Sequence, residues 1–172
     1  MTTLHRFASP VGELVLTASA LGLTAIYFPT SRHGPPRVES EDWVEDDGRG
    51  AAGAILAGAR QQLQEYFAGG RTAFDVPLAA SGTTFERRVW ELLRGIPYGT
   101  TTSYGVLARR LGDPRATRAV GAANGKNPIP IIVPCHRVVG ARGELTGFGG
   151  GIDRKRWLLE HEGALMRLGG GG

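Results

Sequence analysis

The sequence of 172 residues predicts an α/β protein of the α+β type, with a small sheet-and-helix domain followed by a mainly helical domain. Strand-like segments separated by turn residues fill positions 3–28, whereas apolar residues recur mainly at helical spacing after residue 80. Residues 1–80 hold six basic and nine acidic side chains, a net charge of −3, and residues 81–172 hold 14 and seven, a net charge of +7. We therefore expect domains at 1–80 and 81–172, the second suited to an acidic partner.

The first domain is expected to hold a β-meander and one helix. Its strands are predicted at residues 4–8, 13–18 and 23–28. Residues 29–50 are rich in proline, glycine and acidic side chains, which predicts a flexible acidic loop. The helix is predicted at 51–67, because its apolar side chains fall on one face and two glycines follow it. A short extended linker leads to the second domain.

Capping residues mark the helices of the second domain. Thr83 and Glu86 match a capping box, which begins a helix whose apolar residues continue to Ile96. Thr102 or Ser103 is expected to cap the next helix. Asp153 is expected to cap the last helix.

A helix-turn-helix is predicted where the chain reads Gly-Asp-Pro at residues 112–114. Asp113 and Pro114 begin its second helix, at about 114–124, which carries arginines and otherwise consists mainly of small residues. A face of Ala and Gly can lie close against another helix, or in the minor groove of DNA with the arginines at the phosphates. Both interpretations remain open at this point.

Cys135 is the only cysteine, and His136 follows it directly. An internal disulfide, a Cys-x-x-Cys redox pair and a cysteine-rich zinc site are therefore excluded. A single cysteine is often an inert core residue, but a neighbouring imidazole is the usual means of activating a thiol. The prolines at 128, 130 and 134 favour a rigid, extended segment that holds the thiol at the mouth of a pocket.

Six blocks in the second half carry a specific resemblance. They read Thr-Ser-Tyr-Gly at 102–105, Arg-Ala-Val-Gly at 118–121, Gly-Lys-Asn-Pro at 125–128, Pro-Cys-His-Arg-Val at 134–138, Gly-Phe-Gly-Gly-Gly at 147–151 and Trp-Leu-Leu-Glu-His-Glu-Gly at 157–163. Their order and content resemble the 6-O-alkylguanine–DNA alkyltransferases, or methylated-DNA–protein-cysteine methyltransferases. The resemblance implies a ribonuclease H-like first domain and a DNA-binding second domain that also carries the active site.

Four catalytic roles follow from this resemblance. It implies that Cys135 accepts the alkyl group, that His136 acts as base through a water, and that Glu162 orients the imidazole. Tyr104 would donate to the leaving guanine. The implied DNA- or base-binding residues are Arg118, Asn127, Val138, Phe148, Gly149, Thr117, Ala119 and Arg137. Of these, Arg118 would fill the gap left by a flipped base, and Asn127 would brace the turn before the cysteine segment.

The resemblance also implies the partners. The substrate would be double-stranded DNA carrying 6-O-methylguanine, with 4-O-methylthymine as a poorer substrate. The protein would act once as a monomer, with cooperative binding along DNA left open. No cofactor, metal or membrane is expected, since the zinc site of certain members needs an N-terminal cysteine, and His5 and His33 lack partners for one. A cytoplasmic protein at the nucleoid is expected.

Two other functions fit parts of the sequence. A cysteine hydrolase could use Cys135 and His136, but it would turn over many times and would not need Arg118. A non-catalytic damage binder or helix-turn-helix regulator would explain the basic half without a reactive thiol. Substrate in excess distinguishes the first, and replacement of Cys135 distinguishes the second.

Overall fold

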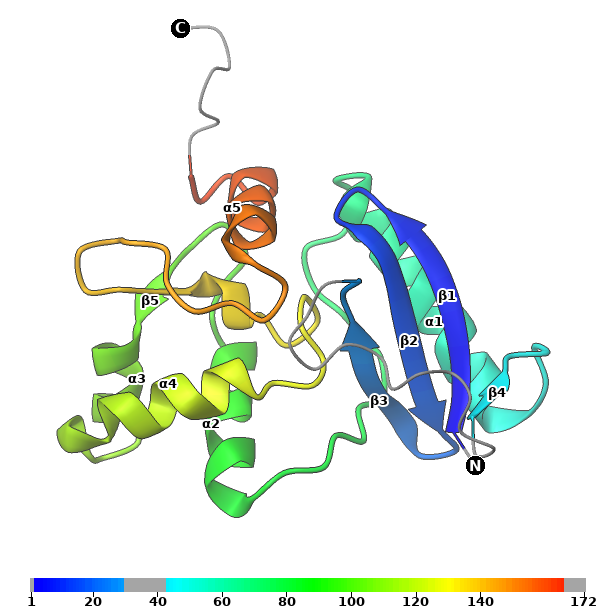
Figure 1. Cartoon of the computed structure of the whole chain (residues 1–172), viewed down its shortest axis with the longest axis horizontal. Coiled ribbons are helices and arrows are strands. Elements are labelled where there is room, and N and C mark those ends of the chain that lie inside the picture. Colours follow the sequence, from blue (N-terminus) through cyan, green and yellow to red (C-terminus); the bar gives the residue numbers. More distant parts are fainter. Residues whose placement is uncertain (1, 30–42, 166–172) are drawn as a thin grey trace, which may run out of the picture. The chain divides into compact units, whose positions relative to one another are not determined.

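The computed structural model describes residues 2–29 and 43–165, and the chain divides into two compact units (Figure 1). Unit 1 comprises Met1–Gly82 together with Pro128–Ile132, and unit 2 comprises Thr83–Asn127 and Val133–Gly172. The return of residues 128–132 to unit 1 was not predicted from the sequence. Residues 128–132 thus belong to unit 1, whereas Cys135 and the residues after it belong to unit 2.

A four-stranded sheet forms the centre of unit 1, with strand order β3-β2-β1-β4. The meander is as predicted: β1 (Thr2–Ser9), β2 (Gly12–Ser19) and β3 (Gly22–Tyr27) pair antiparallel. β4 (Trp43–Glu45) pairs parallel with β1, so the prediction of a loop throughout 29–50 was wrong at this point. Three residues carry no alternation of their own, and β4 exists because the β1 edge supplies its hydrogen-bond partners. Residues 30–42 of the predicted acidic loop lie outside the described residues.

One long helix, α1 (Gly50–Phe67), lies against the sheet of unit 1 (Figure 1). It buries Leu56, Ala59, Leu63 and Tyr66, which recur every three or four residues and so share one face. Full burial of one such large side chain is worth about 1.5–3 kcal/mol. This confirms the amphipathic helix predicted at 51–67.

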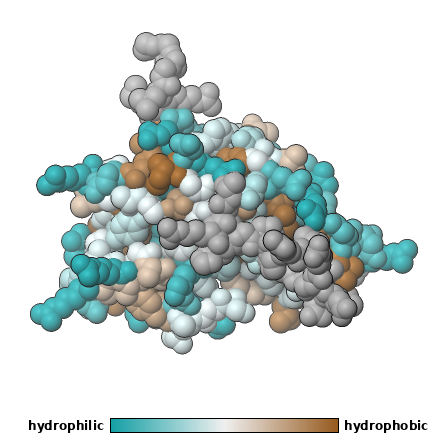
Figure 2. Space-filling view, in the orientation of Figure 1, coloured by the Kyte–Doolittle hydropathy of each residue, from teal (hydrophilic) through white to brown (hydrophobic). Residues whose placement is uncertain are grey.

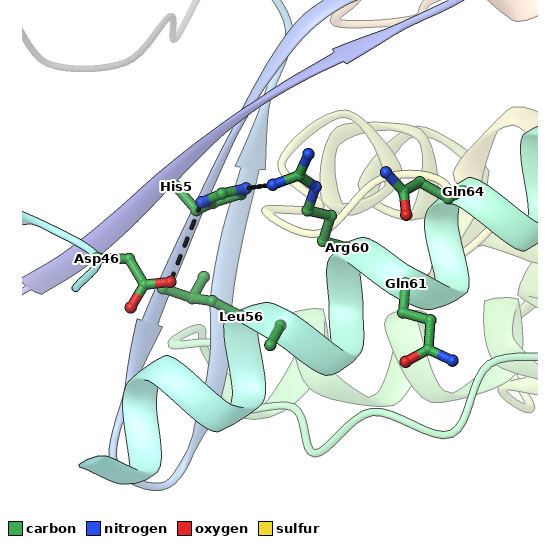
Figure 3. A pocket seen from close by; sticks show the side chains of 7 residues that line it. His5, Asp46, Leu56, Arg60, Gln61 and Gln64 are labelled. Atoms are coloured by element: carbon green, nitrogen blue, oxygen red, sulfur yellow. Dashed lines mark hydrogen bonds and ion pairs between the residues drawn. The ribbon is translucent and has the colours of Figure 1, made fainter. Parts of the chain in front are cut away.

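A polar cluster joins the sheet to this helix (Figure 3). His5 on β1 lies between Arg60 on α1 and Asp46 just after β4. The Arg60 Nη1 to His5 Nε2 distance is 3.0 Å, and the His5 Nδ1 to Asp46 Oδ2 distance is 4.0 Å. The three side chains line an open cavity of about 220 Å³. His5 therefore has a structural partner on each side, while His33 lies outside the described residues.

The β3 edge of the sheet is covered by the linker that follows α1. Leu23 N–H donates to Pro77 O at 2.8 Å, and Ala79 N–H donates to Leu23 O at 2.8 Å. A Cβ at Gly22 would lie only 2.8 Å from Pro77 O, so this close approach requires glycine. Ile26 N–H also donates to Pro128 O at 2.9 Å, which attaches the returning segment 128–132. Few backbone donors of the edge strand are left for pairing with another chain.

The first helix of unit 2, α2 (Thr84–Arg94), begins at the predicted capping box. Glu86 N–H donates to Thr83 Oγ1 at 3.1 Å, and Thr83 N–H donates to Glu86 Oε1 at 2.9 Å. The helix buries Val89, Trp90 and Leu93. Trp90 Nε1–H donates to the Ala123 carbonyl at 2.9 Å, which fixes α2 against the helix that contains Ala123.

That neighbouring helix belongs to the predicted helix-turn-helix. α3 (Tyr104–Arg110) is capped by Ser103, whose Oγ accepts from Val106 N–H at 3.2 Å. The chain then forms a 3₁₀ turn, η1 (Pro114–Ala116), with Asp113 Oδ1 accepting from Arg115 N–H, and continues as α4 (Thr117–Gly125). The α-helix therefore begins at Thr117, three residues after the predicted start at Pro114.

Two short strands and one helix complete unit 2. β5 (Thr102–Ser103) pairs parallel with β6 (Val138–Val139), which places the start of α3 beside the segment that follows Cys135. The 3₁₀ turn η2 (Cys135–Arg137) precedes β6. α5 (Ile152–His161) is preceded by Gly151 at φ +95°, and Asp153 lies in its first turn, so the predicted Asp153 cap was wrong. Glycine at the cap position allows a backbone angle that aspartate rarely adopts.

Hydrophilic side chains predominate on the face of the molecule shown in Figure 2, where hydrophobic residues form small separate groups. Among the described residues, the large apolar side chains that are exposed are Leu21, Val44 and Ile152. Scattered single residues of this kind are normal on protein surfaces. Within the described ranges, no helix is long and apolar enough to cross a lipid bilayer.

Candidate active site

Cys135 is held by a tight turn in unit 2. Its N–H donates to Val133 O at 2.8 Å across Pro134, whose φ of −82° and ψ of 65° define an inverse γ-turn. In unit 1, Ile131 has φ +74° and Ile132 N–H donates to Pro130 O at 2.9 Å. A β-branched residue in this region stores strain of about 1–3 kcal/mol. The prediction of an extended segment was therefore wrong, because consecutive sharp turns replace it.

His136 and Glu162 meet in the core of unit 2. His136 is fully buried, Glu162 is buried at the C-terminal end of α5, and His136 Nε2 lies 2.8 Å from Glu162 Oε2. Because an ionised carboxylate only accepts hydrogen bonds, Nε2 carries the hydrogen and Nδ1 keeps its lone pair. His136 Nδ1 has no protein partner among the described residues. The ring is thus oriented with its basic nitrogen available for a proton.

Arg137 holds this carboxylate in place. Its Nε and Nη2 donate to the two oxygens of Glu162 at 2.8 and 3.0 Å, and its Nη1 donates to Ile96 O at 2.7 Å. Although burial by itself raises the pKa of Glu162, hydrogen bonds from His136 and Arg137 lower it to about 2. Glu162 is therefore ionised at neutral pH, despite its unfavourable place at a helix C-terminus.

The pKa of His136 is lowered, chiefly because burial disfavours the imidazolium, although Glu162 acts in the opposite direction. The imidazole is therefore neutral near pH 7, as a general base must be before it accepts a proton. Arg137, rather than a charged His136, is the counter-cation of Glu162. This arrangement keeps the histidine ready to accept a proton without a permanent charge beside the thiol.

Burial raises the pKa of the Cys135 thiol to about 11, while a side-chain hydrogen bond from Asn127 and the charge of Lys155 lower it. Cys135 is only 5% exposed, so water solvates the thiolate poorly. The resting residue is consequently a thiol whose proton must be removed for reaction. A lone cysteine near a histidine predicts activation, but its degree of burial was not evident from the sequence.

Two asparagines brace the backbone around the thiol. Asn127 Nδ2 donates to Val133 O at 2.8 Å, which joins the two ends of unit 2 that flank residues 128–132. Asn124 is buried, and its Nδ2 lies 3.5 Å from Cys135 O. Asn127 was expected to brace this turn, whereas Asn124 was missed because its burial on α4 follows from tertiary packing.

Tyr104 and Lys155 meet the loop after β6 at the same residue. The Tyr104 hydroxyl lies 3.2 Å from Thr146 Oγ1 and 3.4 Å from Thr146 O. Lys155 Nζ donates to Thr146 O at 2.7 Å and to Val138 O at 2.6 Å. The predicted hydrogen-bond donor and an unpredicted lysine thus contact one loop residue from α3 and α5.

The expected DNA-binding residues divide into exposed and buried groups. Thr117, Arg118 and Ala119 are exposed on the first turn of α4, and Gly149 is exposed in the glycine-rich loop. Phe148 is half-buried, and so is Asn127, which follows the C-terminal end of α4 by two residues. Val138 is buried.

A direct DNA contact for Arg137 is contradicted by its surroundings. Its side chain is 7% exposed, and each of its three nitrogens donates to Glu162 or Ile96. An arginine whose donors are occupied inside the core has none left for a phosphate. Arg137 is therefore a positioning residue for Glu162, and the assignment from the sequence is corrected.

Comparison with known proteins covers both units. The family model described as the ribonuclease-like domain of 6-O-methylguanine DNA methyltransferase matches residues 4–80. The model described as the DNA binding domain of 6-O-methylguanine DNA methyltransferase matches residues 84–164. Together these matches span most of the chain and agree with the ribonuclease H-like first domain that the resemblance implied.

Relatives match over nearly the whole length. The methylated-DNA–protein-cysteine methyltransferase of Mycobacterium bovis is 51% identical over 154 residues, covering 90% of this chain and 88% of the relative. That of Methanosarcina acetivorans is 46% identical over 159 residues, covering 92% and 96%. The crystal structure of Mycobacterium tuberculosis OGT in complex with DNA has a TM-score of 0.83 at 48% identity, covering 94% of this chain and 93% of that chain. The chain belongs to the 6-O-methylguanine DNA methyltransferase family.

Proposed function

We propose that this protein repairs DNA by direct reversal, transferring the methyl group of 6-O-methylguanine irreversibly to Cys135. The observation that carries the proposal is the buried Cys135 followed by His136, whose imidazole is oriented by Glu162 with its Nδ1 lone pair available. Relatives of about half-identical sequence are named for this activity, and one solved relative is a complex with DNA. A thiol that reacts through a neighbouring base fits both observations.

The chemical step is an in-line displacement at the methyl carbon. The Cys135 proton passes through a water to His136 Nδ1, and the imidazolium is stabilised by Glu162. The sulfur then forms a bond to the methyl carbon, while the carbon–oxygen bond breaks and its electron pair stays on guanine. The product is a thioether, and because this chain has no other thiol, nothing in it can regenerate Cys135.

Charge on the leaving guanine would be neutralised by Tyr104. Its hydroxyl, now bonded to Thr146, would turn to donate to the base and supply a proton. The carbonyls of Cys135 and Val138 would accept from the exocyclic amine, and the N–H of Gly149 would face the lesion oxygen. Phe148 would form an apolar wall. These contacts recognise a guanine and disfavour water in the site.

Binding to duplex DNA would use the exposed face of α4. Thr117 and Ala119 are small enough for close approach to the minor groove, and Arg118 between them would fill the gap left by the flipped base. The protein would act as a monomer at the nucleoid in the cytoplasm, with 4-O-methylthymine as a poorer substrate. Binding should weaken as salt rises, since phosphate contacts dominate non-specific affinity.

Product analysis tests this proposal. The protein is incubated with a duplex oligonucleotide that carries one 6-O-methylguanine, and the DNA is digested to nucleosides. Restored deoxyguanosine in an intact strand, together with a methylated Cys135 peptide, is the expected result. Release of the damaged base, strand cleavage, methanol with an unmodified thiol, or binding without any change in the DNA would each overturn it.

Arg118→Ala is expected to slow repair in duplex DNA by about tenfold or more, because a flipped base would leave the stack unsupported. Reaction with free 6-O-benzylguanine should stay within about twofold of the unchanged protein, because no base must be flipped. Single-turnover rates on the two substrates measure the difference. Arg49→Ala, which removes an exposed arginine from unit 1, is the matched control. Equal losses on both substrates would contradict the role given to Arg118.

A further inference from the structure

Lys155 is a buried lysine in the centre of unit 2. Its side chain is fully buried on α5, one of the few charged side chains inside the described structure. Lysine is almost never fully buried unless a partner compensates for its lost hydration. Its burial therefore needs an explanation.

Lys155 holds two backbone carbonyls of the active-site region in place. The Lys155 ammonium donates to the carbonyls of Val138 and Thr146 at 2.6 and 2.7 Å. Val138 follows the Cys135 turn directly, and Thr146 also contacts the hydroxyl of Tyr104. Lys155 thus connects the backbone that follows Cys135 to Thr146, the residue that contacts the Tyr104 hydroxyl. Both of its contacts lie on segments that the proposed function uses to hold guanine.

The buried charges of unit 2 do not balance. The buried ionisable groups of the described residues in unit 2 include two basic side chains, Arg137 and Lys155, and one carboxylate, Glu162. Arg137 and Glu162 form a bidentate pair that neutralises itself. Lys155 contacts only carbonyl dipoles in the described part of the chain, with no carboxylate at ion-pair distance. The interior of unit 2 therefore holds one positive charge in excess of its carboxylates.

Cys135 is the group that can supply the missing negative charge. Burial raises the pKa of Cys135, and the positive charge of Lys155 lowers it. Burial lowers the pKa of Lys155 to about 8, although Cys135 acts in the opposite direction. At neutral pH the lysine is therefore mainly charged while the thiol is still protonated. A preorganised charge of this kind favours a transition state in which negative charge develops.

We propose that Lys155 is a positioning residue for the transfer, fixing the Val138 and Thr146 carbonyls and providing the counter-charge for the Cys135 thiolate. This rests on the proposed function for its biological meaning, but the effect on the thiol does not depend on DNA. The other ionisable groups around the pair are His136 and Arg137 on the cysteine turn, Glu162 at the end of α5, and Tyr104 on α3, whose hydroxyl also contacts Thr146. None of them replaces Lys155, because Arg137 is already paired and His136 is neutral.

The test measures how fast iodoacetamide alkylates Cys135 between pH 6 and pH 10. Lys155→Met removes the charge and the hydrogen bonds, and Lys155→Gln keeps a donor without the charge. Both should react about tenfold more slowly at pH 7, with profiles displaced by about one unit to higher pH, since one pKa unit changes the thiolate fraction tenfold. Lys126→Met, which replaces the other lysine of the chain at an exposed site, should leave the profile unchanged.

A purely structural lysine would lower thermal stability without moving the pH profile, and that outcome would overturn the proposal. If the Lys155 variants do not fold, the charge coupling between Lys155 and Cys135 can be tested in the unchanged protein by titrating its lysines. Protein labelled with ¹³C-lysine gives signals from only Lys126 and Lys155. After Cys135 is alkylated with iodoacetate, which leaves a carboxylate on the sulfur, the titration of Lys155 should move to higher pH while that of Lys126 stays in place. An unmoved Lys155 titration would contradict the charge coupling.

Failure of this inference and failure of the proposed function are separable. If the unchanged protein demethylates DNA but the Lys155 variants keep its rate and thiol profile, only the role of Lys155 is wrong. If the unchanged protein leaves 6-O-methylguanine in DNA intact while Lys155 still shifts the thiol profile, the proposed function fails and the charge coupling stands.

Discussion

Replacement of Cys135 by alanine is expected to abolish methyl transfer while leaving duplex DNA binding essentially intact. The chain has no other thiol. The side chains proposed to enter the minor groove, Thr117, Arg118 and Ala119, lie on α4 and are unchanged in this variant. The loss should be complete within detection, because the displacement has no nucleophile. Transfer is measured as loss of 6-O-methylguanine from a duplex, and binding is measured by fluorescence anisotropy.

Cys135→Ser is the matched control for the size and shape of the side chain at position 135. Serine nearly preserves the size of the side chain, but its hydroxyl ionises far less readily than a thiol, so transfer should also be lost. A serine variant that still removes methyl groups would show that the chemistry does not pass through the sulfur. Loss of DNA binding in both variants, with folding intact, would contradict the separation of nucleophile and DNA-binding face.

Glu162→Gln is expected to produce the second large effect, on both activity and stability. It removes the charge that Arg137 pairs with, and it replaces one of the two oxygens that accept from His136 and Arg137 with an NH2 group that only donates. Breaking a buried pair by removing one partner costs about 3–5 kcal/mol, because the other charge stays buried. Transfer should slow by about a hundredfold, a loss typical of a misoriented general base.

The pH dependence of stability gives a sharper signature. The pKa of Glu162 is about 2 in the folded protein against an ordinary value of 4.5, so its stabilisation is fully present above pH 4.5. It is lost as the pH falls toward 2, and the shift corresponds to about 3 kcal/mol. Urea unfolding from pH 7 to pH 3 should therefore show a smaller acid loss in Glu162→Gln than in the unchanged protein.

Glu160→Gln, on the same helix but partly exposed, serves as the control and should follow the unchanged protein at every pH. An acid loss in Glu162→Gln as large as in the unchanged protein would mean that other carboxylates dominate. Glu162 would then not be the anchor of the buried network.

The elements that the sequence predicts are those whose signals are local. The capping box at Thr83 and the Asp113–Pro114 helix start depend on residues a few positions apart, and both form in the structure. β4 and the β5–β6 pair have two or three residues per strand, so their existence depends on a partner strand distant in sequence. The positive φ of Ile131 likewise cannot be predicted from the sequence. No neighbouring residue favours this backbone angle, so tertiary packing must maintain it.

In the candidate active site, too, local features can be predicted from the sequence, whereas features that depend on tertiary packing cannot. Cys135 and His136 are adjacent, Glu162 follows at the end of a predicted helix, and the family resemblance implies that the three act together. The resemblance assigns Arg137 to DNA binding and gives Lys155 no role, because sequence shows the charge of a cation and not its burial. In the structure, each of the two side chains donates to groups inside unit 2.

The proposed function requires that one thiol accepts one methyl group and is consumed. The protein is mixed with a several-fold excess of duplex carrying 6-O-methylguanine, and restored guanine and intact protein mass are followed until the reaction stops. We expect one restored guanine per chain and a gain of one methylene at Cys135 in every molecule. Continued repair beyond one guanine per chain, or repair with Cys135 unmodified, would contradict the claim.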